Sequence, residues 1–186
     1  MILTHAIEFA AKCHEGQLRK GTDIPYMVHP MEVCAIAATM TSDQEVLAAA
    51  VLHDVAEDYG VTIQELQARF GNRVAALVAS ESELKEEDAE GSWMRRKQHT
   101  IDKLQDACGD ELILTMADKL SNIRAISRDY KKLGDGLWKR FNQQDMNMQA
   151  WYYKAIRDKL EKLGESAAFS EYSDLVDRVF TSPEVN

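Results

Sequence analysis

The sequence contains few residues of the kinds that define special classes of protein. Its 186 residues include three Pro, nine Gly and three Cys. So little Pro and Gly excludes collagen-like and low-complexity chains. An odd number of cysteines without metal-ligand spacing argues against a disulfide framework and indicates a reducing compartment. No apolar run approaches the length of a membrane span, and Glu8 and Lys12 interrupt the apolar N-terminus, so we expect no signal peptide and a cytoplasmic protein.

Basic residues are also in deficit. Lys and Arg number 22 against 31 Asp and Glu, which gives a formal net charge of -9. Such a chain is not expected to bind nucleic acid or a membrane surface, although a local basic pocket is compatible with it. The length suits one domain, which we expect over residues 1–180, followed by a frayed tail at 181–186.

Apolar residues recur at helical spacing through most of the chain, and no segment alternates as a strand does. The sequence therefore predicts an all-α helical bundle in a single domain. Helices are expected over residues 2–15, 31–40, 44–58, 63–70, 73–80, 93–107, 111–128, 151–163 and 169–180. A loop is expected over 16–26, an acidic connection over 81–92 and irregular structure over 129–147.

Several helix starts carry recognisable cap signals. Pro30 suits the first position of a helix, which makes His29 the cap-side residue. Ser42 and Glu45 have the spacing of a capping box, and Thr62 can cap the helix that follows it.

Residues 44–58 are mostly apolar until their end, where His53, Asp54, Glu57 and Asp58 follow one another. On one continuous helix, with about 100° between successive residues, these four share an arc opposite an Ala, Val and Leu face. A helix that is apolar almost all round is normally buried. Three carboxylates at its end then need a metal, cationic partners or open solvent. We expect the functional site at this position.

The other candidates are ambiguous one by one. A histidine before proline, such as His29, more often caps a helix or packs, and His53-Asp54 alone can be a surface ion pair. Asp118 lies in the middle of an apolar predicted helix, so it needs a helix cap, a lysine or a metal as partner. Together the four residues form a two-histidine, two-carboxylate set that suits Mn, Fe, Co or Zn without selecting one.

The order His29, His53-Asp54, Asp118 resembles that of HD-domain metal-dependent phosphohydrolases. Further segments extend the likeness over residues 1–160, namely residues 9–11, 14–20, 25–30, 52–58, 70–71 and 117–122. In this order they resemble the hydrolase domain of RelA/SpoT proteins, and especially the small stand-alone alarmone hydrolases similar to metazoan SpoT homologues. Tyr59 is a departure, because the family often has Thr at that place.

This resemblance implies an HD fold that binds one Mn²⁺ per chain, or another divalent transition metal, through His29, His53, Asp54 and Asp118. It implies hydrolysis of the 3′-pyrophosphate of guanosine 3′,5′-bis(diphosphate), written ppGpp, and of pppGpp. The products would be GDP or GTP and pyrophosphate.

Glu57 and Asp58 match the catalytic pair of that family. Glu57, one turn beyond His53, can act as general base toward water or as general acid toward phosphate, a role worth about 10²–10⁴-fold in rate. Asp58 can orient Glu57 or the water. A solvated helix end is the alternative, but two acids at a helix C-terminus oppose the helix dipole, which favours a functional role.

A polyanionic substrate requires local cations on this acidic protein. The resemblance makes Arg19 and Lys20 contacts to guanine and phosphate, and it makes Asn122 a nucleotide contact. Lys97 and Tyr152 are further candidates for substrate binding. Alternatively, Lys97 lies on an exposed helix face and Tyr152 lies in the core. The sequence leaves the oligomeric state open, with a homodimer as one option.

Two other functions stay open. An HD-type phosphatase can act on a different nucleotide, such as a nucleoside monophosphate or NADPH. A catalytically silent module can bind nucleotides without hydrolysis, although the complete ligand set and both acids argue against it. The Arg19-Lys20 loop and the Glu57-Asp58 pair favour the alarmone hydrolase.

Overall fold

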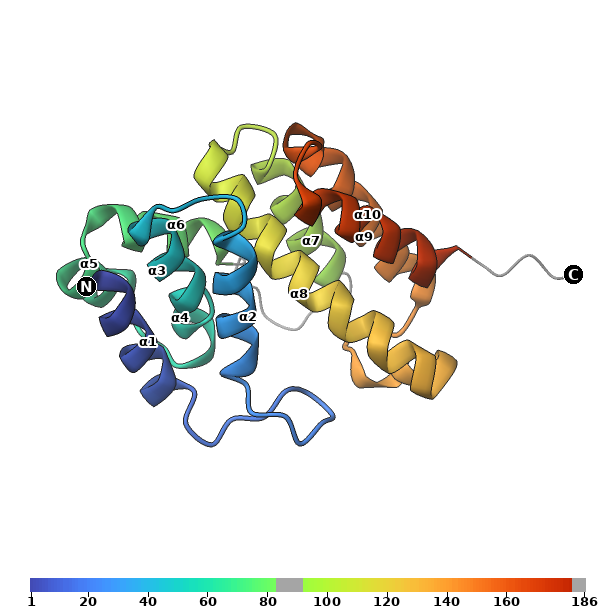
Figure 1. Cartoon of the computed structure of the whole chain (residues 1–186). Coiled ribbons are helices and arrows are strands. Elements are labelled where there is room, and N and C mark those ends of the chain that lie inside the picture. The colour runs from blue at the N-terminus through green and yellow to red at the C-terminus, as the bar shows by residue number, and fades with distance from the viewer. Residues whose placement is uncertain (83–91, 182–186) are drawn as a thin grey trace, which may run out of the picture. The chain divides into compact units, whose positions relative to one another are not determined.

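The computed structural model describes residues 1–82 and 92–181, and every named element in those ranges is a helix (Figure 1). The elements are α1 (Ile2–Cys13), α2 (Val28–Ala37), α3 (Gln44–Leu52), α4 (Val55–Asp58), α5 (Ile63–Phe70), α6 (Asn72–Glu81), α7 (Ser92–Lys103), α8 (Gly109–Leu133), η1 (Gly134–Arg140), α9 (Met146–Lys159), η2 (Leu160–Leu163) and α10 (Ala167–Phe180). The predicted all-α fold is confirmed. Most of the expected acidic connection, and the tail from residue 182, lie outside the described residues.

The chain divides into two compact units. The first comprises the described parts of residues 1–84 and 107–118, and the second those of residues 85–106 and 119–186. The boundary falls within α8, between Asp118 and Lys119. The domain limits at 1 and 180 stay a prediction. No helix in the described ranges is both long enough and apolar enough to cross a membrane.

Helix α3 is the central element of the first unit. It packs against α1, α2 and α6, and its residues from Val46 to Leu52 are all buried. The three consecutive alanines 48–50 have no exposed surface, and such small side chains let neighbouring helices approach closely. A fully buried leucine such as Leu52 contributes about 1.5–3 kcal/mol. The expectation that this apolar helix is buried is confirmed.

The helix start expected at Pro30 is two residues too late, whereas the start expected at Gln44 is confirmed. Helix α2 begins at Val28, so His29 and Pro30 lie inside its first turn. Proline is tolerated there because the first N–H groups of a helix have no acceptor within the helix. The cap of α3 is Asp43, which accepts hydrogen bonds from the N–H groups of Glu45 and Val46, and not a Ser42 capping box. The Thr62 cap of α5 is confirmed.

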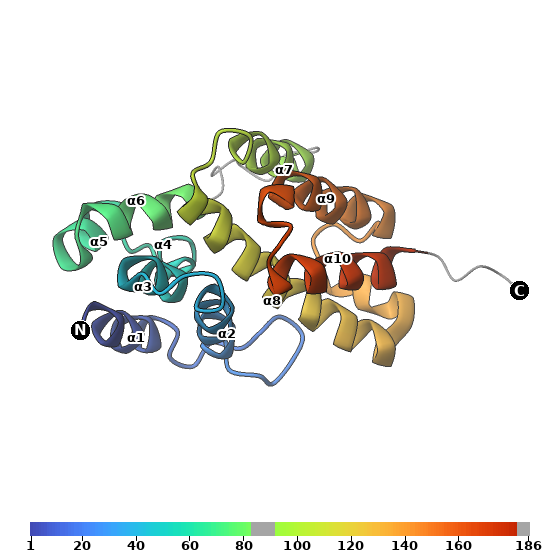
Figure 2. The ribbon, with the colours of Figure 1, turned by 45° about the horizontal axis from the view of Figure 1, so that its top comes forward.

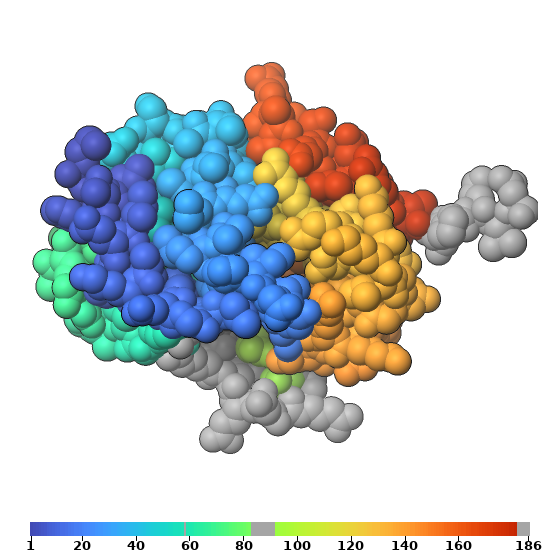
Figure 3. Space-filling view, turned by 60° about the horizontal axis from the view of Figure 1, so that its bottom comes forward, coloured from blue at the N-terminus to red at the C-terminus, as the bar shows by residue number. Residues whose placement is uncertain are grey.

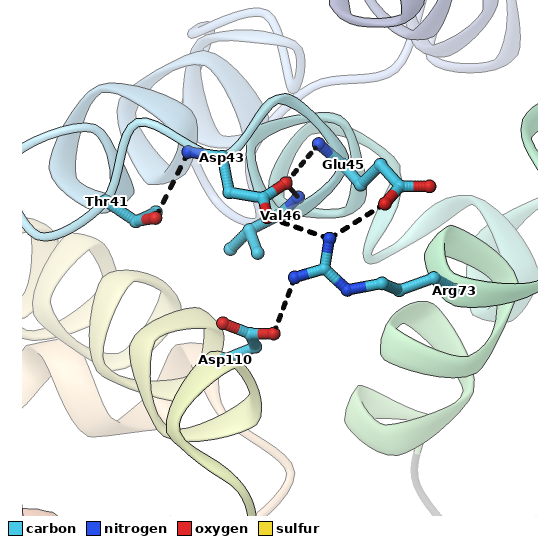
Figure 4. Close-up of polar contacts among 6 residues, drawn as sticks. All are labelled: Thr41, Asp43, Glu45, Val46, Arg73 and Asp110. Carbon is cyan, nitrogen blue, oxygen red and sulfur yellow. Dashed lines mark hydrogen bonds and ion pairs between the residues drawn. The ribbon is translucent and has the colours of Figure 1, made fainter.

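Arg73 on α6 connects the starts of α3 and α8 (Figure 4). Its Nη1 donates to Asp43 Oδ2 and Glu45 Oε2, and its Nη2 donates to Asp110 Oδ2, each over 2.8 Å. The N–H of Glu45 and then Arg73 lower the pKa of Asp43 below its ordinary value. Because Asp110 lies about two turns before Asp118 on α8, these bonds help to fix α8 against α3.

The second unit is built around α9, which lies between α7 and α10 (Figure 2). Its core is rich in aromatic rings: the Phe180 ring lies 5.8 Å from Trp138 and 5.6 Å from Tyr153, between ring centroids. Tyr172 is fully buried and its Oη donates to the carbonyl oxygen of Tyr153 over 3.0 Å.

The structure expected over 129–147, irregular with about one helical turn, is correct for residues 141–145 and wrong for most of the rest. Helix α8 continues to Leu133 and η1 follows it to Arg140. The two glycines at 134 and 136 convert the helix to a 3-10 turn but do not end helical structure, because the Trp138 and Leu137 side chains are buried and hold the segment in place. Helix α9 also starts earlier than predicted, at Met146 after the Asp145 cap.

Candidate metal centre

The His53-Asp54 pair lies at a break between two helices. The predicted continuous helix over residues 44–58 is wrong: α3 ends at Leu52 and α4 begins at Val55. Asp54 has φ -93° and ψ -9°, between the α and turn regions, and its carbonyl accepts the N–H of Glu57, three residues on. On a regular helix adjacent side chains diverge by about 100°. At the break they converge, with His53 Nε2 3.0 Å from Asp54 Oδ2.

Two further helices complete the cluster. His29 comes from the first turn of α2 and Asp118 from the part of α8 that belongs to the first unit. His29 Nε2 lies 3.1 Å from Asp118 Oδ1 and 3.6 Å from Asp54 Oδ2. His53 Nε2 lies 3.7 Å from Asp118 Oδ1. The structure thus brings all four sequence-predicted metal ligands together.

The donor set fits a divalent metal ion. Metal–ligand bonds of about 2.0–2.2 Å put neighbouring ligand atoms roughly 3.0–3.5 Å apart, close to the observed separations. Ligand atoms of His29, His53 and Asp118 all lie within 4.8 Å of one another, and all three residues are buried. The buried Nε2 of His53 has no hydrogen-bond partner within the described ranges, although two carboxylates lie beside it. A buried polar nitrogen that makes no hydrogen bond lowers the stability of the fold unless it binds a ligand such as a metal ion.

Electrostatics within the cluster are strongly coupled. Burial by itself would lower the pKa of His53, but the Asp54 and Asp118 carboxylates outweigh burial and raise that pKa well above its ordinary value. Burial would raise the pKa of Asp54, yet His53 and His29 hold it well below its usual range. For His29 burial prevails and lowers the pKa. In the metal-free cluster the two carboxylates therefore favour the charged form of His53.

Glu57 and Asp58 lie on α4, directly after the break. Glu57 is exposed and is the third residue of α4, four residues after His53 in the chain. The side chain of Asp58 lies outside the described part of the structure. The catalytic assignment of both stays a prediction.

Arg19 and Lys20 lie on the loop between α1 and α2, a segment that Figure 3 draws in blue. A small bridge between Leu18 and Pro25 shapes this loop. Lys20 is exposed and Arg19 is half-buried, with its guanidinium carbon 5.5 Å from the centre of the Tyr26 ring. Both cations thus belong to the unit that holds the metal cluster.

The other three predicted substrate contacts belong to the second unit. Lys97 Nζ lies 4.9 Å from the centre of the Tyr152 ring, and Tyr152 is buried. The core position that was the alternative for Tyr152 is therefore its observed environment. Asn122 is half-buried on α8. Their substrate contacts stay predictions.

Sequence reasoning missed Tyr26 as a residue of the site. Its Oη donates a hydrogen bond of 2.6 Å to Asp54 Oδ2, the oxygen that faces both histidines. Tyr26 does fall within the segment 25–30 that carries the family resemblance. No local pattern indicates, however, that its hydroxyl reaches an aspartate 28 residues further along the chain.

Comparisons with known proteins agree with this geometry. The family model of the HD domain matches residues 6–144. The chain is 38% identical over 123 residues to the guanosine-3′,5′-bis(diphosphate) 3′-pyrophosphohydrolase of Vibrio cholerae, an alignment that covers 63% of this chain and 17% of that protein. The chain thus spans a small fraction of the length of the curated relatives it matches.

Two solved structures share the fold over nearly their whole length. The Listeria monocytogenes EGD-e protein lmo0812 superposes with a TM-score of 0.73 at 33% identity, covering 82% of this chain and 98% of that one. A metazoan ortholog of SpoT, described as hydrolysing ppGpp, superposes with a TM-score of 0.76 at 25% identity, covering 95% and 94%. The match to the HD-domain model and these shared folds show that the chain belongs to the HD-domain family.

Proposed function

We propose that the chain is a metal-dependent hydrolase that removes the 3′-pyrophosphate of ppGpp and pppGpp, releasing GDP or GTP and pyrophosphate. One observation carries the proposal: α2, the α3–α4 break and α8 bring two histidines and two aspartates to a single point, and Glu57 follows on α4 directly after the break. The named activities of the Vibrio cholerae relative and of the metazoan SpoT ortholog support the choice of substrate.

In this proposal His29, His53, Asp54 and Asp118 hold one Mn²⁺. A bound divalent cation supplies a water that ionises near neutral pH and offsets phosphate charge. The mixed nitrogen and oxygen donor set suits Mn²⁺ and also admits Fe, Co or Zn. The three cysteines are free thiols, which supports a reducing, cytoplasmic setting.

Glu57 acts in this proposal as the general base that takes a proton from the attacking water, or as the acid that gives one to the leaving pyrophosphate. It is the third residue of the short helix α4, which follows the buried helix α3 after the break at His53 and Asp54. Asp58 follows and orients Glu57 or the water. General acid–base catalysis of this kind contributes about 10²–10⁴-fold.

Arg19 and Lys20 supply the positive charge that an acidic chain otherwise lacks. Arginine can bind phosphate through two parallel hydrogen bonds or stack on a base. We assign Arg19 and Lys20 to the guanine and the phosphates. Asn122, Lys97 and Tyr152 remain additional proposed contacts to the nucleotide.

The test is a product analysis with purified protein, Mn²⁺ and ppGpp. We expect pyrophosphate and GDP in equal amounts, and a loss of roughly 100-fold or more in kcat for Glu57→Gln with metal affinity retained. Glu65→Gln is the matched control, because Glu65 is a half-buried acid on α5 that pairs with Arg69. Orthophosphate as the only inorganic product, formed from nucleoside monophosphates or NADPH, would favour the other HD-type phosphatases. Tight nucleotide binding without any turnover would favour the silent module.

A further inference from the structure

We propose that Tyr26 is a positioning residue of the metal centre, which holds the Asp54 carboxylate in the orientation that metal binding requires. This inference rests on the proposed metal site and extends it to a side chain outside the four ligands. Tyr26 is half-buried, and it lies two residues before the start of the helix that carries His29.

The contact between Tyr26 and Asp54 is short and selective. Tyr26 Oη donates to Asp54 Oδ2 over 2.6 Å, the length expected of a hydroxyl bound to a charged carboxylate. That oxygen is the one nearest to His53 Nε2 and His29 Nε2. A carboxylate oxygen can accept such a bond and still serve as a metal ligand. The hydroxyl therefore removes the rotational freedom of Asp54 without using up its ligand capacity.

The Tyr26 ring is itself fixed on several sides. The His14 ring lies 4.9 Å from it at a tilt of 31°, and the His29 ring meets it nearly edge-on at 5.9 Å. The Arg19 guanidinium lies over it at 5.5 Å. Such contacts add to the burial of the ring and restrict its rotation. The hydroxyl is thus presented to Asp54 by a ring that is held before metal binds.

The backbone around Tyr26 is held equally well. The N–H of Tyr26 donates to the carbonyl of Gln17 over 2.8 Å, and the N–H of Arg19 donates to the carbonyl of Ile24 over 2.8 Å. The Gln17 side chain accepts hydrogen bonds from His14 Nδ1 and from Tyr59 Oη. Tyr59, the departure from the family pattern, therefore joins the end of α4 to this loop through its hydrogen bond to Gln17.

These two tyrosines provide a matched pair of variants. Both rings touch the His14 ring. The Tyr26 hydroxyl donates to Asp54, and the Tyr59 hydroxyl donates to Gln17. Tyr26→Phe removes the bond to the metal cluster and Tyr59→Phe removes the bond within the loop. Phenylalanine keeps the ring and its packing in both.

The experiment measures the affinity of metal-free protein for Mn²⁺ by titration calorimetry, with no nucleotide present. We expect Tyr26→Phe to weaken Mn²⁺ binding by about 10-fold or more, the size typical for loss of a residue that supports a metal ligand. We expect Tyr59→Phe to leave the affinity within about twofold of the wild type. In an Asp54→Asn background, Tyr26→Phe should change the affinity by less than about twofold, because its partner carboxylate is gone.

Wild-type affinity in Tyr26→Phe would overturn the proposal. Equal weakening in both phenylalanine variants would also overturn it, because the effect would then come from a loosened loop. Urea unfolding of the metal-free variants shows whether Tyr26→Phe folds. If this variant is less stable than the wild type, its effect in the Asp54→Asn background decides whether the loss of Mn²⁺ affinity comes from the missing hydrogen bond. Since metal affinity is measured without substrate, a failure here is distinct from a failure to release pyrophosphate from ppGpp.

Discussion

Nδ1 of His53 lies 2.9 Å from the carbonyl oxygen of Ala50, one turn earlier in α3. Because a carbonyl can only accept, Nδ1 must donate, and the ring presents Nε2 to the Asp54 and Asp118 carboxylates. A backbone bond of this kind fixes the tautomer and orientation of a metal-binding histidine. The last turn of the buried helix thereby determines which nitrogen faces the metal centre.

This contact predicts the tautomer of His53 in the metal-loaded protein. With Zn²⁺ as a diamagnetic substitute, nitrogen-detected NMR of the imidazole should show a proton on Nδ1 and none on Nε2. Comparison with His53→Gln identifies the signal, and the exposed or half-exposed histidines provide the reference for freely exchanging rings. A proton on Nε2 in the metal-loaded state would contradict the orientation described here.

Asp118 should be indispensable for metal binding. Asp118→Asn removes a buried negative ligand while keeping the volume of the side chain. Loss of a residue that only hydrogen-bonds to a metal ligand typically lowers metal affinity by roughly 10–100-fold, so we expect a larger fall in Mn²⁺ affinity for Asp118→Asn. Asp110→Asn is the control, because it makes the same change on the same helix, at the Arg73 cluster. Mn²⁺ titration of both variants checks this. Equal affinities would remove Asp118 from the ligand set.

Metal binding should release a proton. The carboxylates raise the pKa of His53, so its ring is protonated near pH 7 in the metal-free protein, while a metal ligand must be neutral. We therefore expect release of about one proton per Mn²⁺ bound at pH 7, and an affinity that rises with pH until it passes the raised pKa of His53. Calorimetry in two buffers with different ionisation enthalpies measures the proton count. If the enthalpy of Mn²⁺ binding is the same in both buffers, no proton is released and the prediction is wrong.

Tyr172 should make the second unit sensitive to alkali. Burial, with Tyr153 and Tyr152 nearby, raises its pKa well above the ordinary value of 10.0. Above about pH 10 the unfolded chain loses this proton while the folded chain keeps it, so the free energy of unfolding falls as pH rises. We expect Tyr172→Phe to be less stable than wild type at pH 7 by about 1 kcal/mol, because it loses the bond to Tyr153 O.

Between pH 9.5 and 11 the two proteins should then approach each other in stability, which urea unfolding at each pH would measure. Tyr59→Phe serves as the comparison, since Tyr59 is 40% exposed. Parallel curves for wild type and Tyr172→Phe would show that the buried phenol does not cause the loss.

The sequence by itself determined the features that depend on near neighbours in the chain. Apolar periodicity and local cap residues predicted most of the helices. The Thr62 cap of α5 could be predicted because it joins Thr62 to Glu65, only three residues further along the chain. The order of His29, His53, Asp54 and Asp118 also indicated which residues meet, through the family resemblance. It did not indicate how they meet.

Only the tertiary structure decided the geometry of the site. Periodicity predicts one straight helix through His53, because Ala, Val and Leu continue past it, yet the chain breaks there and both side chains turn to the same point. Tyr26 reaches Asp54 across 28 residues, and Thr115 of α8 donates to Glu81 across 34. Such contacts depend on how packed helices place residues that are distant in the chain. The packing energy that selects this arrangement is shared among many side chains, so no local sequence pattern indicates it.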